Sequence, residues 1–315
     1  MRAAVSVSAA LPLALRELPP RPLRRGEVRV RTGAIGVNPV DWKMREAGPL
    51  YFAYQLLGPG GGFVPGIDFA GSVVELGPGA SGLALGDRVV GGTDFSRGQR
   101  GSYADEVVVR PDQCAVLPPE VSDETAACLP VPAVTAWMAL SERSRLGPGK
   151  KVLVLGAAGG VGLATLQLGA MIGASCVGVC STRNVALVEA EGAVAIDYTK
   201  GDALAAAAAF GPYDLVLHLV GTDVYPLAAC RALLAPGGRV ELVVIRPADY
   251  PFLLLPSVGT LLGAPNRARL TPLVEAAARG ALRPRIEAIL PLAEAEESHA
   301  ISRRGKVVGK LLLRP

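Results

Sequence analysis

Between residues 123 and 265, short apolar runs alternate along the chain with alanine-rich stretches. The run 152–155 is valine and leucine throughout, which is typical of a strand buried on both faces of a parallel sheet. Because helix-compatible stretches separate these runs, the pattern predicts repeated βαβ units. Right-handed crossovers would set the carboxyl ends of the strands on one sheet edge, where such folds bind ligands. We expect strands at 152–155, 175–179, 193–196, 215–219 and 239–244.

The first 120 residues follow a different pattern, with short apolar runs separated by glycine and proline. This spacing predicts an all-β, barrel-like fold with strands near 27–32, 69–76, 88–91 and 104–109. The last 50 residues predict a helix at 270–279 and strand-like pieces that rejoin this first domain. The fold class is therefore α/β, with a doubly wound parallel sheet inserted in a β-rich domain and a cleft between the two. The expected domains are 1–122 with 266–315, and 123–265.

A glycine cluster, GAAGGVG at 156–162, follows the first apolar run of the α/β region. Its register, Ala157-x-Gly159-x-x-Gly162, matches the dinucleotide-binding fingerprint with alanine at the first position. Glycines let the backbone approach a pyrophosphate, and the N-terminus of the following helix offers free N–H groups to it. A plain tight turn between strand and helix is the alternative. The residues expected to bind the dinucleotide here are Ala158, Gly159, Gly160 and Val161.

Composition narrows the class of protein. Half of the 315 residues are hydrophobic, so a substantial core can be buried, and no apolar stretch has the character of a membrane span. The net charge of +4 is small and the basic residues are dispersed, so we expect no nucleic-acid partner. The N-terminal segment, interrupted by Pro12, is interpreted as a first strand rather than a signal peptide. Five cysteines, mostly in apolar runs, predict reduced thiols and a cytoplasmic location.

Seven segments occur in order along nearly the whole chain: GAIGVNPVDWKMREAG, VPGIDFAGSVVELGPGASGLALGDRVVG, LPVPAVTAWMAL, GAAGGVGLATLQLGAMIGA, AIDYTKGD, LAPGGRVELVVI and GKLLL. Together they resemble the medium-chain dehydrogenase/reductase superfamily, and within it the zinc-free quinone oxidoreductase (zeta-crystallin-like) and enoyl reductase branch. The resemblance implies a Rossmann sheet inserted in a GroES-like catalytic domain. It also implies a homodimer formed through the edge of the nucleotide-binding sheet, and a plastid location for a plant or algal source.

The residues at the zinc positions of this superfamily argue against a metal. Asn38 stands where zinc-dependent members carry a ligand cysteine, and Ile67-Asp68 stands where they carry a His-Glu pair. Without a Lewis acid an alkoxide is hard to stabilise, whereas reduction of an activated C=C bond needs only hydrogen bonds and a proton. The expected activity is therefore NAD(P)H-dependent reduction of a quinone, an enone or alkenal, or an enoyl thioester.

The catalytic candidates are Asn38, Lys43 and Tyr51. The resemblance places Asn38 beside the nicotinamide and substrate, although an asparagine before proline also suits a turn. Lys43 could offer positive charge to an enolate, although a solvated loop lysine is the favoured alternative. Tyr51 lies roughly where related enoyl reductases carry a tyrosine proton donor, and a core aromatic is the alternative. Asp41, in the same motif as Asn38, is expected to orient the loop.

The dinucleotide is expected to be NADPH, with NADH possible. No acidic residue occurs between Gly162 and Glu189, where an NAD-binding carboxylate would lie, and Ser181 and Arg183 suit a 2′-phosphate. An exposed arginine at a helix start is the competing explanation. Each further position has a structural alternative as a core, turn or edge-strand residue. These further cofactor-binding candidates are Thr135, Tyr198, Val220, Gly221, Val244 and Lys310.

Two other functions remain open. One is a nucleotide-binding, crystallin-like protein without turnover, because the glycine loop and Arg183 report binding alone. The other is a trans-acting enoyl reductase that serves a polyketide carrier protein. Arginines around the cleft mouth would suit the phosphates of either a phosphopantetheine arm or coenzyme A.

Overall fold

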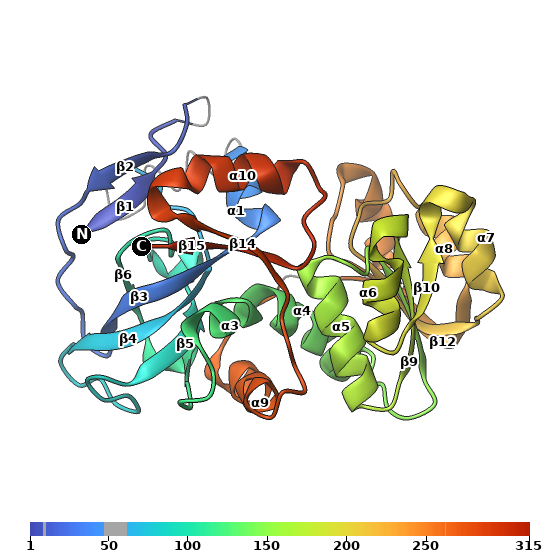
Figure 1. The fold of residues 1–315 in the computed structure, drawn as a ribbon, viewed down its shortest axis with the longest axis horizontal. Coiled ribbons are helices and arrows are strands. Elements are labelled where there is room, and N and C mark those ends of the chain that lie inside the picture. The colour runs from blue at the N-terminus through green and yellow to red at the C-terminus, as the bar shows by residue number, and fades with distance from the viewer. Residues whose placement is uncertain (9–10, 47–61, 262) are drawn as a thin grey trace. The chain divides into compact units, whose positions relative to one another are not determined.

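The structure is a computed structural model that describes residues 1–8, 11–46, 62–261 and 263–315 (Figure 1). The chain forms two compact units. Unit 1 comprises Met1–Val131, Ala264–Gly280 and Pro284–Pro315, and unit 2 comprises Pro132–Gly263 and Ala281–Arg283. The domain boundaries expected at 122/123 and 265/266 stay a prediction. The two compact units meet after Val131 and after Gly263, but compact units are not the same as domains.

Unit 2 is built on a six-stranded parallel sheet in the order β10-β9-β8-β11-β12-β13. This is the doubly wound order, in which the chain starts at the centre, moves to one edge and returns to build the other half. The order reverses at β8, so the crevice for a ligand is expected at the carboxyl ends of β8, β9 and β11. The strands are β8 (Lys151–Leu155), β9 (Ser175–Cys180), β10 (Val194–Asp197), β11 (Tyr213–His218), β12 (Leu234–Leu242) and β13 (Val258–Thr260).

Helices connect these strands. The segment before β8 is helical in pieces, with wider π-type turns over Leu129–Ala133 and Met138–Arg143 on either side of α4 (Val134–Trp137). The others are α5 (Gly160–Met171), α6 (Val185–Ala190), α7 (Ala203–Ala208) and α8 (Leu227–Ala232), with short 3₁₀ turns at Thr182–Asn184, Tyr198–Lys200 and Pro247–Leu254.

The predicted strands of the α/β region agree with the structure to within one or two residues at most of their ends, with two larger differences. β12 begins at Leu234, five residues before the expected start, because Leu234 already pairs with Tyr213; the register then shifts over APGG before Arg239 pairs with Leu215. β13 was not predicted, because its three residues Val-Gly-Thr give no apolar run. It pairs with β12 and completes one edge of the sheet.

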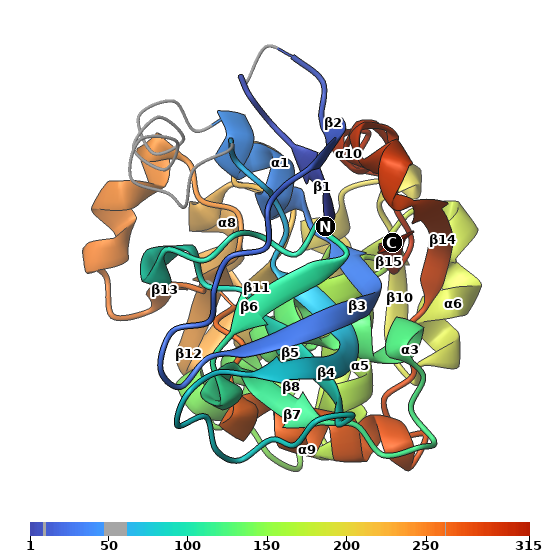
Figure 2. The ribbon, with the colours of Figure 1, turned by 90° about the vertical axis from the view of Figure 1, so that its left-hand side faces the viewer.

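Unit 1 is the β-rich part of the chain (Figure 2). Its main sheet has the order β14-β15-β3-β4-β5-β7, with β6 paired to β3, and a separate pair joins β1 and β2. The C-terminal β15 pairs with β3, so the tail joins the β-rich unit as the fold class predicts. The strands are β1 (Arg2–Val5), β2 (Ala14–Glu17), β3 (Val28–Val37), β4 (Asp68–Leu76), β5 (Arg88–Gly92), β6 (Glu106–Val109), β7 (Cys114–Val116), β14 (Ile286–Pro291) and β15 (Lys310–Arg314).

Among the described residues of unit 1, four helices accompany these strands: α1 (Pro39–Glu46), α3 (Asp123–Ala127), α9 (Arg267–Ala278) and α10 (Ala295–Arg303). Helix α9 starts three residues before the predicted helix because Asn266 caps it, accepting a hydrogen bond from the Arg269 N–H. Helix α1 begins directly after Asn38, so the end of β3 and the start of α1 fix the position of this residue.

Candidate functional site

The glycine loop of unit 2 joins β8 to α5. Gly159 is the N-cap residue of α5, and the helical hydrogen bonds begin with Leu163 N–H donating to the Gly159 carbonyl at 2.9 Å. The N–H groups of Gly160, Val161 and Gly162 precede that first bond, so the helix itself does not use them. All three stand at the positive end of the twelve-residue helix dipole, which favours an anion.

The glycines of this loop serve two separate steric purposes. A Cβ atom on Gly162 would lie 2.5 Å from the carbonyl oxygens of Gly156 and Ala157, so this position requires glycine for the loop to close. A Cβ atom on Gly159 would meet no described atom closer than 3.7 Å, so the space in front of the helix is open. A loop that is closely packed at Gly162 and has open space at Gly159 fits a dinucleotide pyrophosphate.

The end of β9 carries the residues expected to select the cofactor. Arg183 is exposed within the turn Thr182–Asn184, and Ser181 accepts a hydrogen bond from the Asn184 amide at 3.3 Å. Thr182 is linked through Thr199 (Oγ1 to Oγ1, 2.7 Å) to a carboxylate at the end of β10, that of Asp197. Asp197 lies beyond the stretch between Gly162 and Glu189, where an NAD-binding carboxylate is expected.

The other predicted cofactor residues of unit 2 lie in different surroundings. Tyr198 is half-exposed after β10, and Val220 follows β11 with 37% of its surface exposed. Val244 follows β12 and is partly buried, whereas Thr135 is fully buried in α4. The structure therefore brings the glycine loop and Val220 to the carboxyl edge of the sheet, and places Thr135 inside the unit.

Unit 1 holds a cluster of buried polar side chains around Asn38. The Asn38 amide donates to Asp68 Oδ2 at 3.0 Å and accepts a short hydrogen bond from Lys310 Nζ. Lys310 Nζ also lies 2.8 Å from Asp68 Oδ2, and both side chains are almost fully buried. These bonds fix which way the Asn38 amide points, because the ammonium can only donate and the carboxylate can only accept.

A second carboxylate completes the cluster. Asp41 Oδ2 accepts hydrogen bonds from the Asn38 backbone N–H at 2.8 Å and from the Tyr103 hydroxyl at 3.1 Å. Its other oxygen, Oδ1, is buried without a hydrogen-bond partner among the described residues. Gly36 permits the packing, because a Cβ atom there would lie 2.7 Å from that of Asp68. Asp41 thus orients the loop after β3, as expected from the sequence.

The two carboxylates share one lysine, and burial acts on both. Burial raises the pKa of Asp41 to about 7; the nearby charge of Asp68 adds to this, while the Asn38 N–H and Lys310 oppose it. Burial also raises the pKa of Asp68 against the opposing effect of Lys310. The pKa of Tyr103 is raised well above its ordinary value by burial and by Asp41. With a pKa of about 7, Asp41 changes its proton content near neutral pH.

Replacing Asp41 by asparagine will change how stability depends on pH. Because the pKa of Asp41 rises on folding from its ordinary 3.8 to about 7, the folded chain holds a proton that the unfolded chain releases, and this stabilisation fades between those values as pH rises. Wild type will therefore lose stability relative to Asp41→Asn over that interval, measured by urea unfolding at several pH values.

A matched variant, Asp105→Asn, controls for other carboxylates. Burial pushes the pKa of Asp105 upward, but hydrogen bonds from Arg2 outweigh this and lower it, so the wild-type residue stabilises the protein above its ordinary pKa. The stability that wild type has over Asp105→Asn will therefore be lost as pH falls below that value, which is the opposite pH trend to that of Asp41. Parallel pH profiles of wild type and Asp41→Asn would contradict the raised pKa of Asp41.

The sequence interpretation of this cluster was incomplete. Tyr103 lies in none of the seven segments that carry the family resemblance. The sequence identifies Asp68 only as the residue at a zinc-ligand position. Lys310 was expected to bind the cofactor or to protect a sheet edge. The edge alternative is wrong, because β15 lies between β14 and β3 and Lys310 is 4% exposed. Its pairing with Asp68 leaves a signal in the sequence only once β15, β3 and β4 are known to be neighbours.

Lys43 and Tyr51 are the two remaining catalytic candidates. Lys43 is exposed on α1, with Nζ 5.5 Å from the centre of the Trp42 ring. Tyr51 lies outside the described residues. Both roles remain predictions from the sequence.

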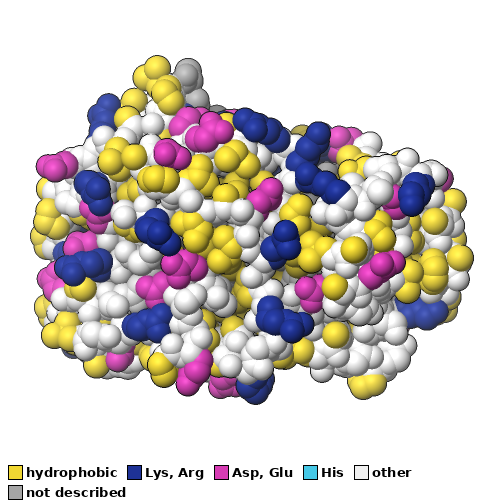
Figure 3. All heavy atoms as spheres, in the orientation of Figure 1, with side chains coloured by type: hydrophobic (Ala, Val, Ile, Leu, Met, Phe, Trp, Pro, Cys, Tyr) yellow, Lys and Arg dark blue, Asp and Glu magenta, His cyan; other side chains and the backbone are white. Residues whose placement is uncertain are grey.

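Within the described residues, no group of three or more His, Cys, Asp and Glu side chains could hold a metal ion. All five cysteines are unpaired and buried, including Cys176 and Cys180 on β9. In the same described ranges, no helix has the length and apolar character needed to cross a membrane. On the face drawn in Figure 3, basic and acidic side chains are intermingled.

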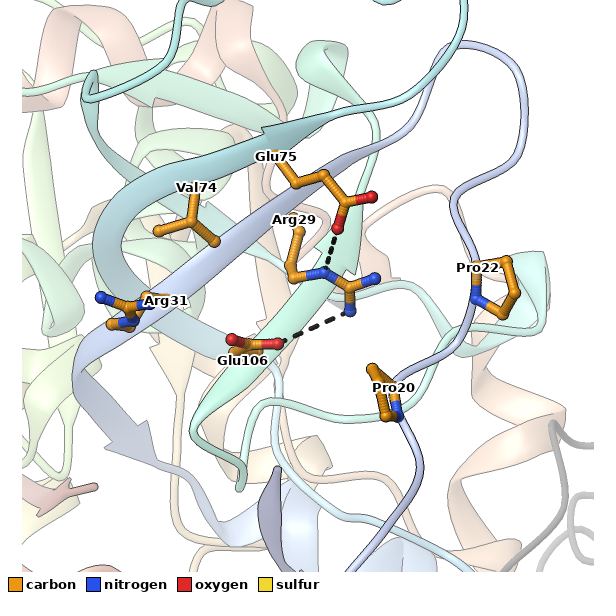
Figure 4. A pocket seen from close by; sticks show the side chains of 7 residues that line it. All are labelled: Pro20, Pro22, Arg29, Arg31, Val74, Glu75 and Glu106. Carbon is orange, nitrogen blue, oxygen red and sulfur yellow. Dashed lines mark hydrogen bonds and ion pairs between the residues drawn. The ribbon is translucent and has the colours of Figure 1, made fainter.

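A pocket of about 540 Å³ lies on unit 1 near the start of β3 (Figure 4). Arg29 crosses it, donating through Nε to Glu75 at 2.7 Å and lying 3.6 Å from Glu106. These ion pairs neutralise the guanidinium locally, so the pocket does not resemble a phosphate site. Asn38 follows the opposite end of the same strand, so the pocket is separate from the buried cluster.

Comparison with known proteins agrees with the fold. Residues 24–119 match the alcohol dehydrogenase GroES-like domain, and residues 191–313 match the family described as zinc-binding dehydrogenase. The chain is 30% identical over 309 residues to the chloroplastic quinone-oxidoreductase QR1 of Triphysaria versicolor, covering 92% of this chain and 90% of the relative. A trans-enoyl reductase of Aspergillus terreus is 33% identical over 206 residues, covering 63% and 57%.

A solved structure gives the same result. The quinone oxidoreductase from Coxiella burnetii superposes with a TM-score of 0.88 at 28% identity, covering 100% of this chain and 98% of that one. The strand order of unit 2, the β-rich unit formed by both chain ends and the similarity over nearly the full length all agree. The protein belongs to the medium-chain dehydrogenase/reductase superfamily and is similar to its quinone oxidoreductases and enoyl reductases.

Proposed function

We propose that this protein is a zinc-independent, NADPH-dependent reductase whose substrate is a quinone or an activated C=C bond in an enone, alkenal or enoyl thioester. The observation that carries the proposal is the hydrogen bonding of Asn38 and Asp68, which stand at zinc-ligand positions of the superfamily. Both are bonded to the buried ammonium of Lys310. In this chain a buried ammonium group, that of Lys310, thus bonds to the side chains at both positions, which supports a site without zinc.

The residues of unit 2 support the cofactor assignment. The open loop at Gly159 and the N–H groups of Gly160 and Val161 would hold the pyrophosphate, and Arg183 with Ser181 would bind a 2′-phosphate. The nucleotide supplies a hydride when bound. No acidic residue occurs between Gly162 and Glu189, and this favours NADPH over NADH.

The residues of unit 1 would stabilise the negative charge that develops on the substrate oxygen. The Asn38 Nδ2 group carries a second hydrogen besides the one given to Asp68, and its orientation is fixed by Lys310. A pre-oriented donor stabilises an enolate more than a mobile one because no reorganisation is needed. Asp41, with a pKa near 7, holds a proton next to the same loop. Lys43 and Tyr51 remain proposed contributors of charge and of a proton.

Rapid mixing of the NADPH-loaded protein with quinones, alkenals and enoyl-CoA esters tests the activity. We expect NADPH fluorescence to disappear with at least one class, at a rate that a metal chelator leaves unchanged. If no compound oxidises NADPH, the enzyme proposal fails and the crystallin-like binding function takes its place. Sensitivity to the chelator would refute zinc independence alone.

A shortened thioester separates the substrate classes. If the enzyme serves a carrier protein or coenzyme A, cutting an active enoyl-CoA down to a small thioester will lower the rate, because the phosphates of the long arm are lost. An unchanged rate would favour small enones and alkenals.

The assembly proposed is a homodimer formed through the β13 edge. Support comes from apolar side chains that precede this edge strand, of which Leu254 is 89% exposed and Tyr250 61% exposed. The molecular mass in solution tests this. A reducing compartment, the cytoplasm or a plastid, is proposed from the five unpaired cysteines.

A further inference from the structure

A fully buried histidine ends the central strand β11. His218 lies between Leu155 of β8 and Leu242 of β12 in the parallel sheet, so its strand neighbours are apolar. The superfamily resemblance assigns this residue no role, and the activity proposed above does not use it. Directly after it comes the loop 219–225, which contains the predicted cofactor residues Val220 and Gly221.

One ring nitrogen of His218 faces a backbone carbonyl of that loop, and the other faces a backbone N–H. Nε2 lies 3.0 Å from the Tyr225 carbonyl oxygen, which can only accept, so Nε2 must carry the hydrogen. Nδ1 accepts the Gly221 N–H at 3.4 Å and must therefore be unprotonated. The backbone thus selects the neutral Nε2–H form. Burial acts in the same direction and lowers the pKa of His218, although Asp223 and Asp249 oppose it.

These two hydrogen bonds join the beginning and the end of the loop. Gly221 has a φ of +106°, in the left-handed region that favours glycine, and its carbonyl accepts the Val224 N–H at 3.0 Å. On its outer side the loop is held by Thr222, whose hydroxyl donates to Asp249 at 2.8 Å, and by an exposed Asp223–Arg246 ion pair. The buried histidine is the anchor on the inner side.

The anchored loop lies against the glycine loop. A Cβ atom added to Gly156, which also has a positive φ of +101°, would come within 2.9 Å of Val220 Cγ1. Val220 therefore packs directly on the first glycine of the segment that is proposed to hold the pyrophosphate. Because Val220 contacts Gly156 directly, we expect a change in the loop after β11 to displace Val220 and the glycine loop together.

We propose that His218 is a positioning residue for dinucleotide binding: its neutral imidazole bridges Gly221 and Tyr225 and thereby holds Val220 against the glycine loop. This inference rests on the proposed NADPH-binding function and assigns it a residue that does not itself contact the cofactor. The neutral imidazole is required because a hydrogen on Nδ1 would face the Gly221 N–H and break the bridge.

Replacement of His218 tests the proposal through NADPH affinity. His218→Phe keeps a buried aromatic ring and removes both hydrogen bonds, so we expect the NADPH Kd to rise about tenfold. His218→Gln can donate and accept, and will restore most of the affinity. His299→Phe is the matched control. His299 is also fully buried, in unit 1, but its ring nitrogens have no hydrogen-bond partner among the described residues. This variant should leave the NADPH Kd unchanged.

NMR spectra of the wild-type histidines test the proposal if His218→Phe does not fold. The chain has two histidines, so ¹⁵N-histidine labelling gives two imidazole spectra, assigned with His299→Phe. We expect His218 in the Nε2–H form at neutral pH, with an Nδ1 signal that shifts when NADPH binds. A folded His218→Phe with wild-type affinity, the opposite tautomer, or an unchanged Nδ1 signal in saturated protein would each overturn the proposal. If wild type binds no NADPH, the proposed function fails instead.

Discussion

Replacing Lys310 by methionine will lower the free energy of unfolding by about 3–5 kcal/mol, the cost usually found when one partner of a buried ion pair is removed. The Lys310 ammonium is 2.8 Å from Asp68, and these side chains are 4% and 0% exposed. Methionine fills a similar volume but leaves the Asp68 carboxylate and the Asn38 amide oxygen without their cationic donor. Urea unfolding followed by tryptophan fluorescence and circular dichroism measures the loss.

Two comparisons isolate the effect of burial. In Asp68→Asn/Lys310→Met the uncompensated charge is gone, so much of the lost stability should return. Lys150→Met removes a lysine from an exposed pair with Asp214, whose Nζ–Oδ1 distance of 2.9 Å is nearly the same, and should cost at most about 1 kcal/mol. If Lys310→Met is no less stable than Lys150→Met, the interpretation of the cluster as a buried charge pair is wrong.

Local sequence patterns were sufficient to predict the part of the molecule in which neighbours in sequence are neighbours in space. The apolar run 152–155, the glycines after it and the helix-compatible stretch beyond them define one βα unit, and the structure has each in the expected place. The same reasoning missed β13, because a three-residue strand that contains glycine differs little from a turn. It also placed the start of β12 too late, since APGG carries turn residues and lies in the register shift between the Leu234–Tyr213 and Arg239–Leu215 pairs.

The buried cluster could not be predicted in the same way, because its members are far apart in sequence. Lys310 and Asn38 are separated by 272 residues, and they meet only because β15 pairs with β3. The loop-orienting role of Asp41 was predictable because its partner is three residues away. Tyr103 reaches Asp41 across 62 residues and leaves no local signal. The sequence thus identified the motif around Asn38 but not the ammonium that orients its amide.

The identity of the nucleotide is open to a direct test at Arg183. Replacing it by alanine will weaken NADPH binding by about 1–3 kcal/mol, roughly fivefold to 150-fold in Kd, because a charge-assisted hydrogen bond to the 2′-phosphate is lost. NADH carries a hydroxyl in that position, so its affinity should hardly change. The exposed position of Arg183, directly after the strand that ends at Cys180, makes the side chain accessible to such a phosphate.

Fluorescence titration of both nucleotides with wild type, Arg183→Ala and Arg231→Ala distinguishes phosphate recognition from a general effect of charge. Arg231 is an exposed arginine of the same unit on α8, bonded to Ser257, so its removal changes the net charge equally without touching the end of β9. Selective loss of NADPH affinity in Arg183→Ala alone is the expected result. Equal weakening of NADPH and NADH would mean that Arg183 acts as a structural residue at the helix start, and the preference for NADPH would then have no residue to carry it.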